Sequence, residues 1–234
     1  MSTVLITGAN RGLGYEFVKQ YSEKGFNIFA CCRNVDKAKN LKELAEVSSN
    51  IKIYELNVDD IKTIKNLSQQ LQDEKIDVLI NNAGIYRSST VGNINYDEWL
   101  ESFKVNTIAP YQMVENFLDQ IINGDLKKVV SITSKMGSID DNTSGGSYIY
   151  RSSKTALNSM MRSLTHDLKN QGIATLTLHP GWVRTDMGGP GGWIDAFESV
   201  QGMIKQIDKL TIDDSGKYLD YAGKTINWWS KYKV

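Results

Sequence analysis

The chain has 234 residues, a length that a single α/β domain often reaches, so it can bury a sizeable core. Its 27 Lys and Arg residues equal its 27 Asp and Glu residues, so no overall field would attract nucleic acid or an anionic membrane. The first residues lack a signal-peptide pattern, and no window approaches the ~18 apolar residues of a membrane span. We therefore expect a cytoplasmic protein without nucleic-acid or membrane partners.

Short apolar runs rich in β-branched residues alternate with longer stretches of helical spacing, such as Leu13, Phe17, Val18 and Tyr21. This alternation predicts a doubly wound α/β fold, with a parallel sheet and helices on both faces. With three prolines and no low-complexity linker, the chain is expected to form one domain over 1–234. The predicted strands are 4–7, 27–31, 51–56, 78–81, 129–133 and 174–179.

The two cysteines, Cys31 and Cys32, are adjacent at the end of the second predicted strand. Adjacent cysteines seldom form a relaxed disulfide, and two thiols do not make a zinc site, so we expect both to pack in the core or at the strand end. His166 is expected on a helix face and His179 at a strand end. No His, Cys and carboxylate grouping has metal-site spacing, and the sequence therefore predicts no metal.

A glycine-rich turn, TGANRGLG from Thr7 to Gly14, follows the first strand and opens the first helix. Glycines let the backbone turn tightly and approach a pyrophosphate, which the amide groups and dipole of a helix N-terminus stabilise. The spacing G-x-x-x-G-x-G departs from the common dinucleotide pattern G-x-G-x-x-G. Taken alone, the turn fits a phosphate cradle and a turn that binds nothing about equally well.

The end of the second strand indicates which dinucleotide fits. An enzyme that uses NAD usually has an acidic residue about 20 residues beyond the glycines, which accepts hydrogen bonds from the ribose 2′-hydroxyl. This chain has Arg33 there, and Arg11 in the glycine turn. Two guanidinium groups that flank a 2′-phosphate favour NADPH. The alternative interpretation is a pair of solvated surface arginines.

Tyr150 and Lys154 are four residues apart on a predicted helix and share one face, whereas Tyr148 points away from the lysine. A free tyrosine, with a pKa near ~10, is a poor proton relay at neutral pH unless positive charge stabilises its anion. Lys154 can supply that charge. Ser134 lies just past the strand 129–133, at the strand end where open α/β sheets bind ligands. Chance also produces Y-x-x-x-K matches, and Tyr148 is interpreted as a pocket wall or a packing residue.

Together these motifs resemble the classical short-chain dehydrogenase/reductase family. TGANRGLG, NNAG at 81–84, KVNTIAP, SITS, YRSSK and HPGWVRTDM occur in the family's order and at its usual intervals. The resemblance implies a Rossmann fold in which Tyr150 protonates the substrate oxygen as hydride arrives from a nicotinamide. Ser134 would hydrogen-bond the carbonyl, and Lys154 would lower the tyrosine pKa and hold the nicotinamide ribose. Asn106 would anchor a water that links Lys154 to solvent.

Other positions acquire roles only through this resemblance. The NNAG turn would pack beside the adenosine and steady the sheet, and Pro180 with Gly181 would shape a turn against the nicotinamide. Val183 and Thr185 would hold its carboxamide. Asn57 stands where the family usually has an aspartate that contacts the adenine. The expected cofactor-binding residues are Gly8, Asn10, Arg11, Gly12, Leu13, Gly14, Arg33, Asn57, Val58, Asn82, Ala83, Gly84, Tyr150, Lys154, Pro180, Gly181, Val183 and Thr185.

A narrower likeness to C-factor and sniffer-like carbonyl reductases rests on CRN, NTSGGSY, LHPGWV and a near-terminal YAGKTINWW. It implies small aldehydes, ketones or quinones as substrates. The expected function is therefore NADPH-dependent carbonyl reduction. The alternative is a dinucleotide-responsive regulatory or signalling protein with vestigial catalysis, against which the intact catalytic set argues.

The family commonly pairs through two long helices, here about 97–122 and 147–170, so a homodimer or a tetramer is expected. The apolar residues Met160, Met161, Leu164 and Leu168 fit either a core or such an interface.

The glycine-rich segment 181–197 is a candidate lid, and the substrate loop is expected at about 186–203; the other interpretation is a plain surface loop. Trp228 and Trp229 fit a pocket wall, a core cover or a subunit contact equally well.

Overall fold

The computed structural model describes residues 1–228 and contains one sheet of seven strands in the order β3-β2-β1-β4-β5-β6-β7. Every neighbouring pair is parallel. The strands are β1 (Thr3–Thr7), β2 (Asn27–Cys32), β3 (Ile51–Glu55), β4 (Val78–Asn81), β5 (Lys128–Ile132), β6 (Ala174–His179) and β7 (Lys217–Asp220). The order reverses between β1 and β4, which is the doubly wound arrangement that the sequence predicts.

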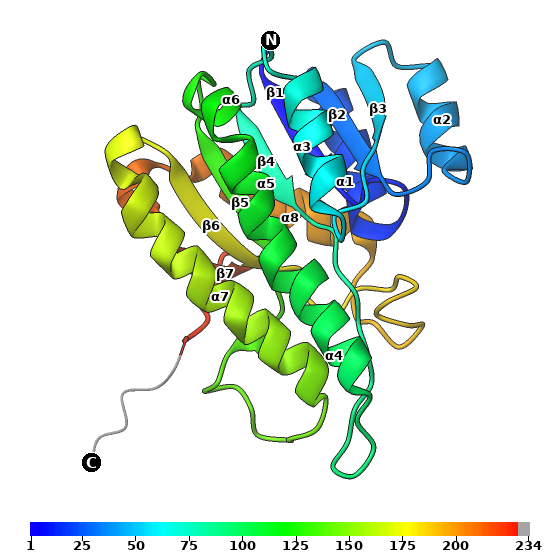
Figure 1. Cartoon of the computed structure of the whole chain (residues 1–234), viewed down its shortest axis with the longest axis vertical. Helices are drawn as coiled ribbons and strands as arrows, with labels where there is room; N and C mark the ends of the chain where they lie inside the picture. The colour runs from blue at the N-terminus through cyan, green and yellow to red at the C-terminus, as the bar shows by residue number, and fades with distance from the viewer. Residues whose placement is uncertain (229–234) are drawn as a thin grey trace.

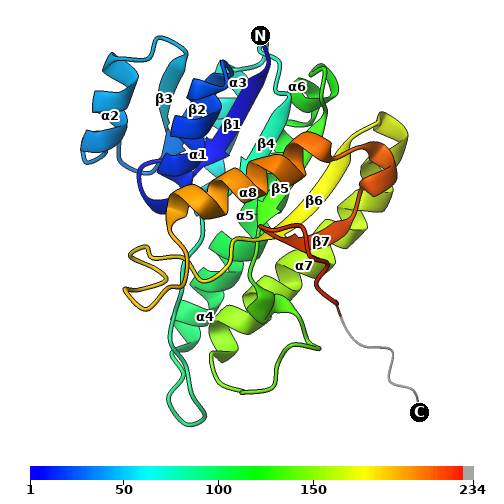
Figure 2. The ribbon, with the colours of Figure 1, turned by 180° about the vertical axis from the view of Figure 1, so that it is seen from behind.

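Helices cover both faces of the sheet. One face carries α3 (Ile61–Gln70), α5 (Ala109–Asn116) and α7 (Tyr148–Leu168) (Figure 1). The opposite face carries α1 (Gly12–Glu23) and α8 (Ala196–Lys209), with α2 (Lys39–Glu46) beside β3 (Figure 2). The remaining helices are α4 (Tyr96–Phe103) and α6 (Leu118–Ile122).

Alternating strand residues build a separate core on each face. On β1, Val4 and Ile6 pack toward α1 and α8, whereas Leu5 packs toward α3, α5 and α7. Cys31 and Cys32 follow the same alternation, and both are free and buried, as predicted. The helical residues Met161, Leu164 and Leu168 belong to the second core and Met160 packs against it, which settles their setting as core.

The sequence prediction missed the seventh strand, β7. Of its four residues only Tyr218 is buried, so the segment lacks the apolar run that identified the other six. It lies at the sheet edge, where one side of a strand needs no partner, and a mixed polar sequence suffices there. As shown below, Tyr218 contacts the candidate site.

The helix expected over about 97–122 is divided into α4, a π-helical turn (Lys104–Ile108), α5 and α6. Pro110 lies in the first turn of α5, and a proline has no N–H for a regular helical hydrogen bond, which favours an interruption just before it. By contrast, the helix expected over 147–170 is confirmed as α7, which a short 3-10 turn (Lys169–Gln171) extends. The expected substrate loop over about 186–203 is shorter than predicted, because α8 already begins at Ala196.

No helix among residues 1–228 is long and apolar enough to span a bilayer. The loops that follow β4, β5 and β6 project from one end of the sheet, where α4 and the first turns of α7 also lie (Figure 1).

Candidate active site

The glycine turn has the geometry of a phosphate cradle. Gly8 and Gly12 have φ of +67° and +54°, which glycine adopts without strain. A Cβ on Gly14 would lie 2.1 Å from the carbonyl oxygen of Gly8, so no larger residue fits there. The helix α1 begins at Gly12, and within the described part of the chain no side chain caps its first amides. Free amides at a helix N-terminus suit the pyrophosphate of a dinucleotide.

The NNAG segment after β4 holds this turn in place. The backbone amides of Asn82 and Ala83 both donate to the hydroxyl of Thr7, each at 3.0 Å. The side-chain amide of Asn82 donates to the carbonyl oxygens of Thr7 and Gly8 at 2.9 and 3.2 Å. The expected role of NNAG in steadying the sheet thus has a concrete form: it fixes the first residues of the glycine turn.

The two arginines expected near a 2′-phosphate are both exposed. The amide of Ala9 donates to the carbonyl of Cys31, which places the glycine turn beside the end of β2, directly before Arg33. The guanidinium of Arg11 forms a 2.8 Å ion pair with Asp186 of the loop after β6. Arg11 thus joins the glycine turn to the candidate lid, a contact that the sequence did not predict.

Asn57 and Val58 follow β3 at the same end of the sheet. The side-chain oxygen of Asn57 accepts a long 3.4 Å bond from the amide of Asp59, and its carbonyl accepts from the hydroxyl of Thr63 at 2.7 Å. Val58 lines a small internal space together with Thr7, Asn81 and Ala83. The expected adenine-side residues therefore adjoin the glycine turn and the end of β4.

Tyr150 lies on the first turns of α7 and is only 8% exposed, whereas Tyr148 is 38% exposed. The nitrogen Nζ of Lys154 is 5.9 Å from the centroid of the Tyr150 ring. The Ser134 side chain lies near enough to the phenol to lower its pKa. The structure thus brings together Ser134, Tyr150 and Lys154, and it separates Tyr148 from them.

Burial dominates the protonation of this group. Burial raises the pKa of Tyr150 to about 12, and the lowering effect of Ser134 does not offset it. Burial also lowers the pKa of Lys154 to about 8. Lys154 donates to the carbonyl of Ile132 at 2.9 Å, and the expected effect of its charge on the phenol pKa stays a prediction.

Asn106 lies in the π-helical turn and is fully buried. Its side-chain oxygen accepts from the amide of Ile85 at 2.8 Å, and its nitrogen donates to the Ile85 carbonyl and to the Ser153 hydroxyl at 2.9 and 3.0 Å. Ser153 directly precedes Lys154. The side chain of Asn106 thus ties the segment after NNAG to α7, and π-helical turns are frequent at functional sites.

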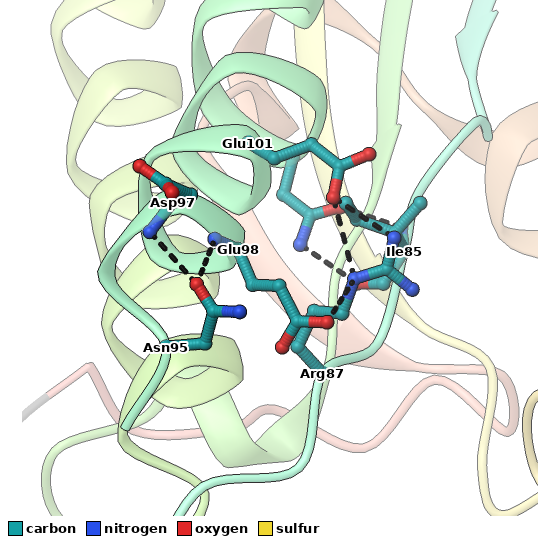
Figure 3. Close-up of polar contacts among 7 residues, drawn as sticks. Ile85, Arg87, Asn95, Asp97, Glu98 and Glu101 are labelled. Atoms are coloured by element: carbon teal, nitrogen blue, oxygen red, sulfur yellow. Dashed lines mark hydrogen bonds and ion pairs between the residues drawn. The ribbon is translucent and has the colours of Figure 1, made fainter.

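The segment 85–95 continues from this clamp and holds the start of α7. Figure 3 shows Arg87 between Glu98 and Glu101 of α4, and its ion pair with Glu101 measures 2.8 Å. Two residues on, the buried Ser89 accepts from the amide of Ile149 through its hydroxyl at 3.0 Å, and through its carbonyl from the amide of Ser147 at 2.9 Å. Ser89 therefore caps the helix that carries Tyr150.

Tyr86 completes the surroundings of Tyr150. The two rings meet edge to face with centroids 5.0 Å apart, and the Tyr86 hydroxyl lies 3.2 Å from that of Ser147. Sequence reasoning missed both Tyr86 and Ser89, since neither belongs to a spaced motif. Their position shortly after NNAG, in a loop at the ligand end of the sheet, was the available signal.

The loop after β6 is ordered by its own backbone. Val183 is buried and pairs in parallel with Ile194, and the Thr185 hydroxyl accepts from the amide of Gly188 at 3.2 Å. The methyl group of Thr185 would lie 3.6 Å from a Cβ on Gly12. The expected carboxamide-binding residue therefore lies against the glycine turn.

The start of the same loop is anchored to α8 and turns sharply. The carbonyl of Pro180 accepts from the Ser199 hydroxyl at 2.6 Å, and Gly181 has φ of +85°.

Within residues 1–228, no group of three or more His, Cys, Asp or Glu side chains is placed to hold a metal ion.

The match to a family model decides what kind of protein carries this site: the model described as short chain dehydrogenase matches residues 2–191. The chain belongs to the short-chain dehydrogenase family. The sequence resemblance is thereby confirmed, and the protein is an oxidoreductase of this family with a Rossmann-type fold.

Relatives within the short-chain dehydrogenase family differ in their described roles. The protein named C-signal of Myxococcus xanthus is 43% identical over 154 residues, which cover 65% of this chain and 93% of that protein. A 1-hydroxy-2-glutathionyl-2-methyl-3-butene dehydrogenase of Rhodococcus sp. (strain AD45) is 32% identical, with 97% of this chain and 100% of the relative covered.

Two solved structures of the family have a TM-score of 0.91 with this chain. One is the carbonyl reductase Sniffer of D. melanogaster, which is 34% identical, with coverage of 97% of this chain and 100% of that one. The other is an NADPH-bound carbonyl reductase from chicken fatty liver, 35% identical, with coverage of 97% and 99%.

Proposed function

We propose that the protein is an NADPH-dependent carbonyl reductase that acts on small aldehydes, ketones or quinones. The observation that carries the proposal is the grouping of Tyr150, Ser134 and Lys154 at the ligand end of the sheet, beside a phosphate cradle. The similarity to an NADPH-bound carbonyl reductase and to Sniffer supports the choice of reaction.

We propose a task for each group. When bound, the nicotinamide supplies hydride to the carbonyl carbon. Negative charge then develops on the substrate oxygen, where the Ser134 hydroxyl donates a hydrogen bond and the Tyr150 phenol donates a proton. With a pKa of about 12, the phenol keeps its proton at neutral pH, which is the form that a general acid needs. Lys154, charged below about pH 8, stabilises the phenolate that remains.

The cofactor preference rests on Arg11 and Arg33. No acidic residue occupies the end of β2, and the glycine turn and that strand end are joined by the Ala9 to Cys31 hydrogen bond. Two guanidinium groups in this region favour a 2′-phosphate. Pro180, Gly181, Val183 and the glycine turn are proposed to enclose the rest of the dinucleotide.

The decisive experiment follows oxidation of NADPH and NADH against a panel of aldehydes, ketones and quinones. Tyr150→Phe is expected to lower kcat by about 10²–10⁴-fold, because it removes the proton donor but keeps the ring. Tyr148→Phe is the matched control and should leave turnover roughly unchanged. Wild-type turnover in Tyr150→Phe would contradict the assigned acid.

A second candidate function is a dinucleotide-responsive signalling protein with weak reductase activity. The 43% identity to C-signal favours it. The same assay separates the two functions: NADPH binding without turnover of any carbonyl supports the signalling role, and turnover that depends on Tyr150 supports the reductase.

We also propose a homodimer formed through α4 and α7. On α4, Tyr96 and Leu100 are 71% and 64% exposed, and they line an open apolar hollow with Trp99 and Phe103. Such a continuous apolar surface is typical of a subunit interface. Sedimentation at micromolar concentration tests this: the wild type should be a dimer and Leu100→Asp a monomer, whereas a monomeric wild type would contradict the proposal.

A further inference from the structure

The turn that carries Ser134 is bound at its start by a residue of the edge strand β7. The hydroxyl of Tyr218 donates to the carbonyl oxygen of Ser134 at 2.6 Å, across 84 residues of sequence. The amide of Gly137 donates to the same oxygen at 2.8 Å. Tyr218 is 1% exposed, so the bond is shielded from solvent.

The other end of the turn is bound by the segment after β7. The Ser138 hydroxyl donates to the carbonyl of Asn227, and the amide of Ile139 donates to the carbonyl of Trp228 at 3.2 Å. The ring of Trp228 packs against the ring of Tyr218, with centroids 5.1 Å apart. Residues 134–139, the Ser134 turn, are thus held at both ends by one C-terminal segment.

A residue of α7 completes this arrangement. Asn158 lies one turn beyond Lys154; it accepts from the Thr133 hydroxyl at 2.7 Å and donates to the carbonyl of Gly137 at 3.1 Å. Asn158 also lies near the Tyr218 phenol and lowers its pKa. Burial raises the pKa of Tyr218 above its usual range, so its hydroxyl remains a donor. Tyr218 of β7 therefore contacts both α7 and the Ser134 turn and holds them together.

We propose that Tyr218 is a positioning residue that aims the Ser134 hydroxyl at the phenol of Tyr150, with Trp228 as the packing that holds its ring. This inference rests on the proposed carbonyl reduction and adds a residue to it. The bond fixes the backbone of Ser134, and the backbone sets the direction of its side chain. A displacement of about 1 Å in a reacting group is enough to lower turnover by about 10²-fold.

Tyr218→Phe tests the inference because it removes one hydroxyl and keeps the ring against Trp228. We expect kcat to fall by about tenfold to a hundredfold, with the KM for NADPH nearly unchanged. In a Ser134→Ala background the same substitution should cause no further loss. A full additional loss in that background would show that Tyr218 does not act through Ser134.

Tyr21→Phe is the matched control. Tyr21 lies on α1, is also 1% exposed and belongs to the core on that face of the sheet. Among the described residues its hydroxyl has no hydrogen-bond partner. Its loss should leave kcat unchanged. An equal fall of kcat in both variants would overturn the specific role of Tyr218.

A readout without turnover separates this inference from the proposed function. Amide hydrogen exchange at Gly137 and Ile139 should become faster in Tyr218→Phe and stay at wild-type rates in Tyr21→Phe. Unchanged exchange in Tyr218→Phe overturns the positioning role even in an active enzyme. Faster exchange in a protein that reduces no carbonyl would support the bracing of the turn and reject the proposed reaction.

Discussion

Asn106 and Ile85 bind each other twice: the side-chain oxygen of Asn106 accepts from the Ile85 amide, and its nitrogen donates to the Ile85 carbonyl. Both partners lie at the ligand end of the sheet, between the NNAG segment and α7. Ile85 lies beyond the end of β4, where no neighbouring strand can bind its backbone. The Asn106 side chain supplies the hydrogen bonds that its N–H and C=O groups need. The pair therefore fixes the start of the segment from which Tyr86 and Ser89 contact α7.

Asn106→Ala should destabilise the fold as well as the site. It leaves the half-buried amide and carbonyl of Ile85 without partners, and an unpaired group costs about 1–3 kcal/mol when it is buried. We expect the free energy of unfolding to fall by about 2–4 kcal/mol in urea titrations. Asn116→Ala on α5, where the side chain makes one 2.8 Å bond to Gln112, is the matched control and should lose less than about 1 kcal/mol. Equal losses would contradict the special role of the clamp.

The rate of reduction should depend on pH through Lys154. Burial lowers the pKa of its ammonium group to about 8, so the group is charged below that pH and neutral above it. In the proposed mechanism the charged form stabilises the developing phenolate, so kcat/KM should fall as pH rises through about 8. Lys154→Arg, which stays charged, should be slower overall but lack this alkaline limb. A wild-type profile that is flat from about pH 7 to 9 would contradict the assignment.

The stability of the protein should decline in acid because of His179. Burial lowers its pKa to about 4; Lys135 adds to this effect, and Asp220 and Asp141 partly offset it. The unfolded chain therefore binds a proton between about pH 6.5 and 4 that the folded chain does not. The free energy of unfolding therefore falls by up to about 3 kcal/mol as the pH falls from about 6.5 to 4, and His179 causes no further loss below that range.

Denaturation at several pH values measures this effect. In His179→Gln, the free energy of unfolding should change less between pH 6.5 and 4. The substitution also removes the buried Nδ1 of His179, which has no hydrogen-bond partner among the described residues. His166→Gln, at an exposed position of α7, should retain the wild-type dependence. If His179→Gln also retains it, the acid lability has another origin.

The ion pair between Arg11 and Asp186 should compete with the proposed 2′-phosphate. Both side chains are largely exposed, and such pairs contribute up to about 1 kcal/mol. Asp186→Asn frees the guanidinium, so NADPH should bind up to about fivefold tighter at low salt, while NADH affinity stays the same. Asp167→Asn, which changes the net charge equally at an exposed position of α7, is the control. Tighter binding in both variants would indicate a general charge effect.

Much of the fold could be predicted because the six strands are apolar runs and their alternation with helical spacing is a local property. The four-residue spacing of Tyr150 and Lys154 also predicted a shared face, since helix geometry fixes it. These inferences need only neighbouring residues.

The rest depends on contacts between distant segments. Tyr218 lies in a polar stretch and joins the site through a bond to Ser134 that no spacing indicates. Ser89 caps α7 from another loop, and Arg11 pairs with a residue 175 positions away. The burial that raises the pKa of Tyr150 also comes from the assembled fold, which no local pattern indicates. Trp229, one half of the tryptophan pair, lies outside the described residues.

The edge strand β7 has a consequence for the order in which the protein matures on the ribosome. Synthesis reaches Tyr218 only after the whole of α7 and β6, 84 residues beyond Ser134. A nascent chain can therefore form its central strands and bury both cores before Tyr218 binds the Ser134 turn. We therefore expect the Ser134 turn to become ordered late in folding, when the last strand of the sheet docks.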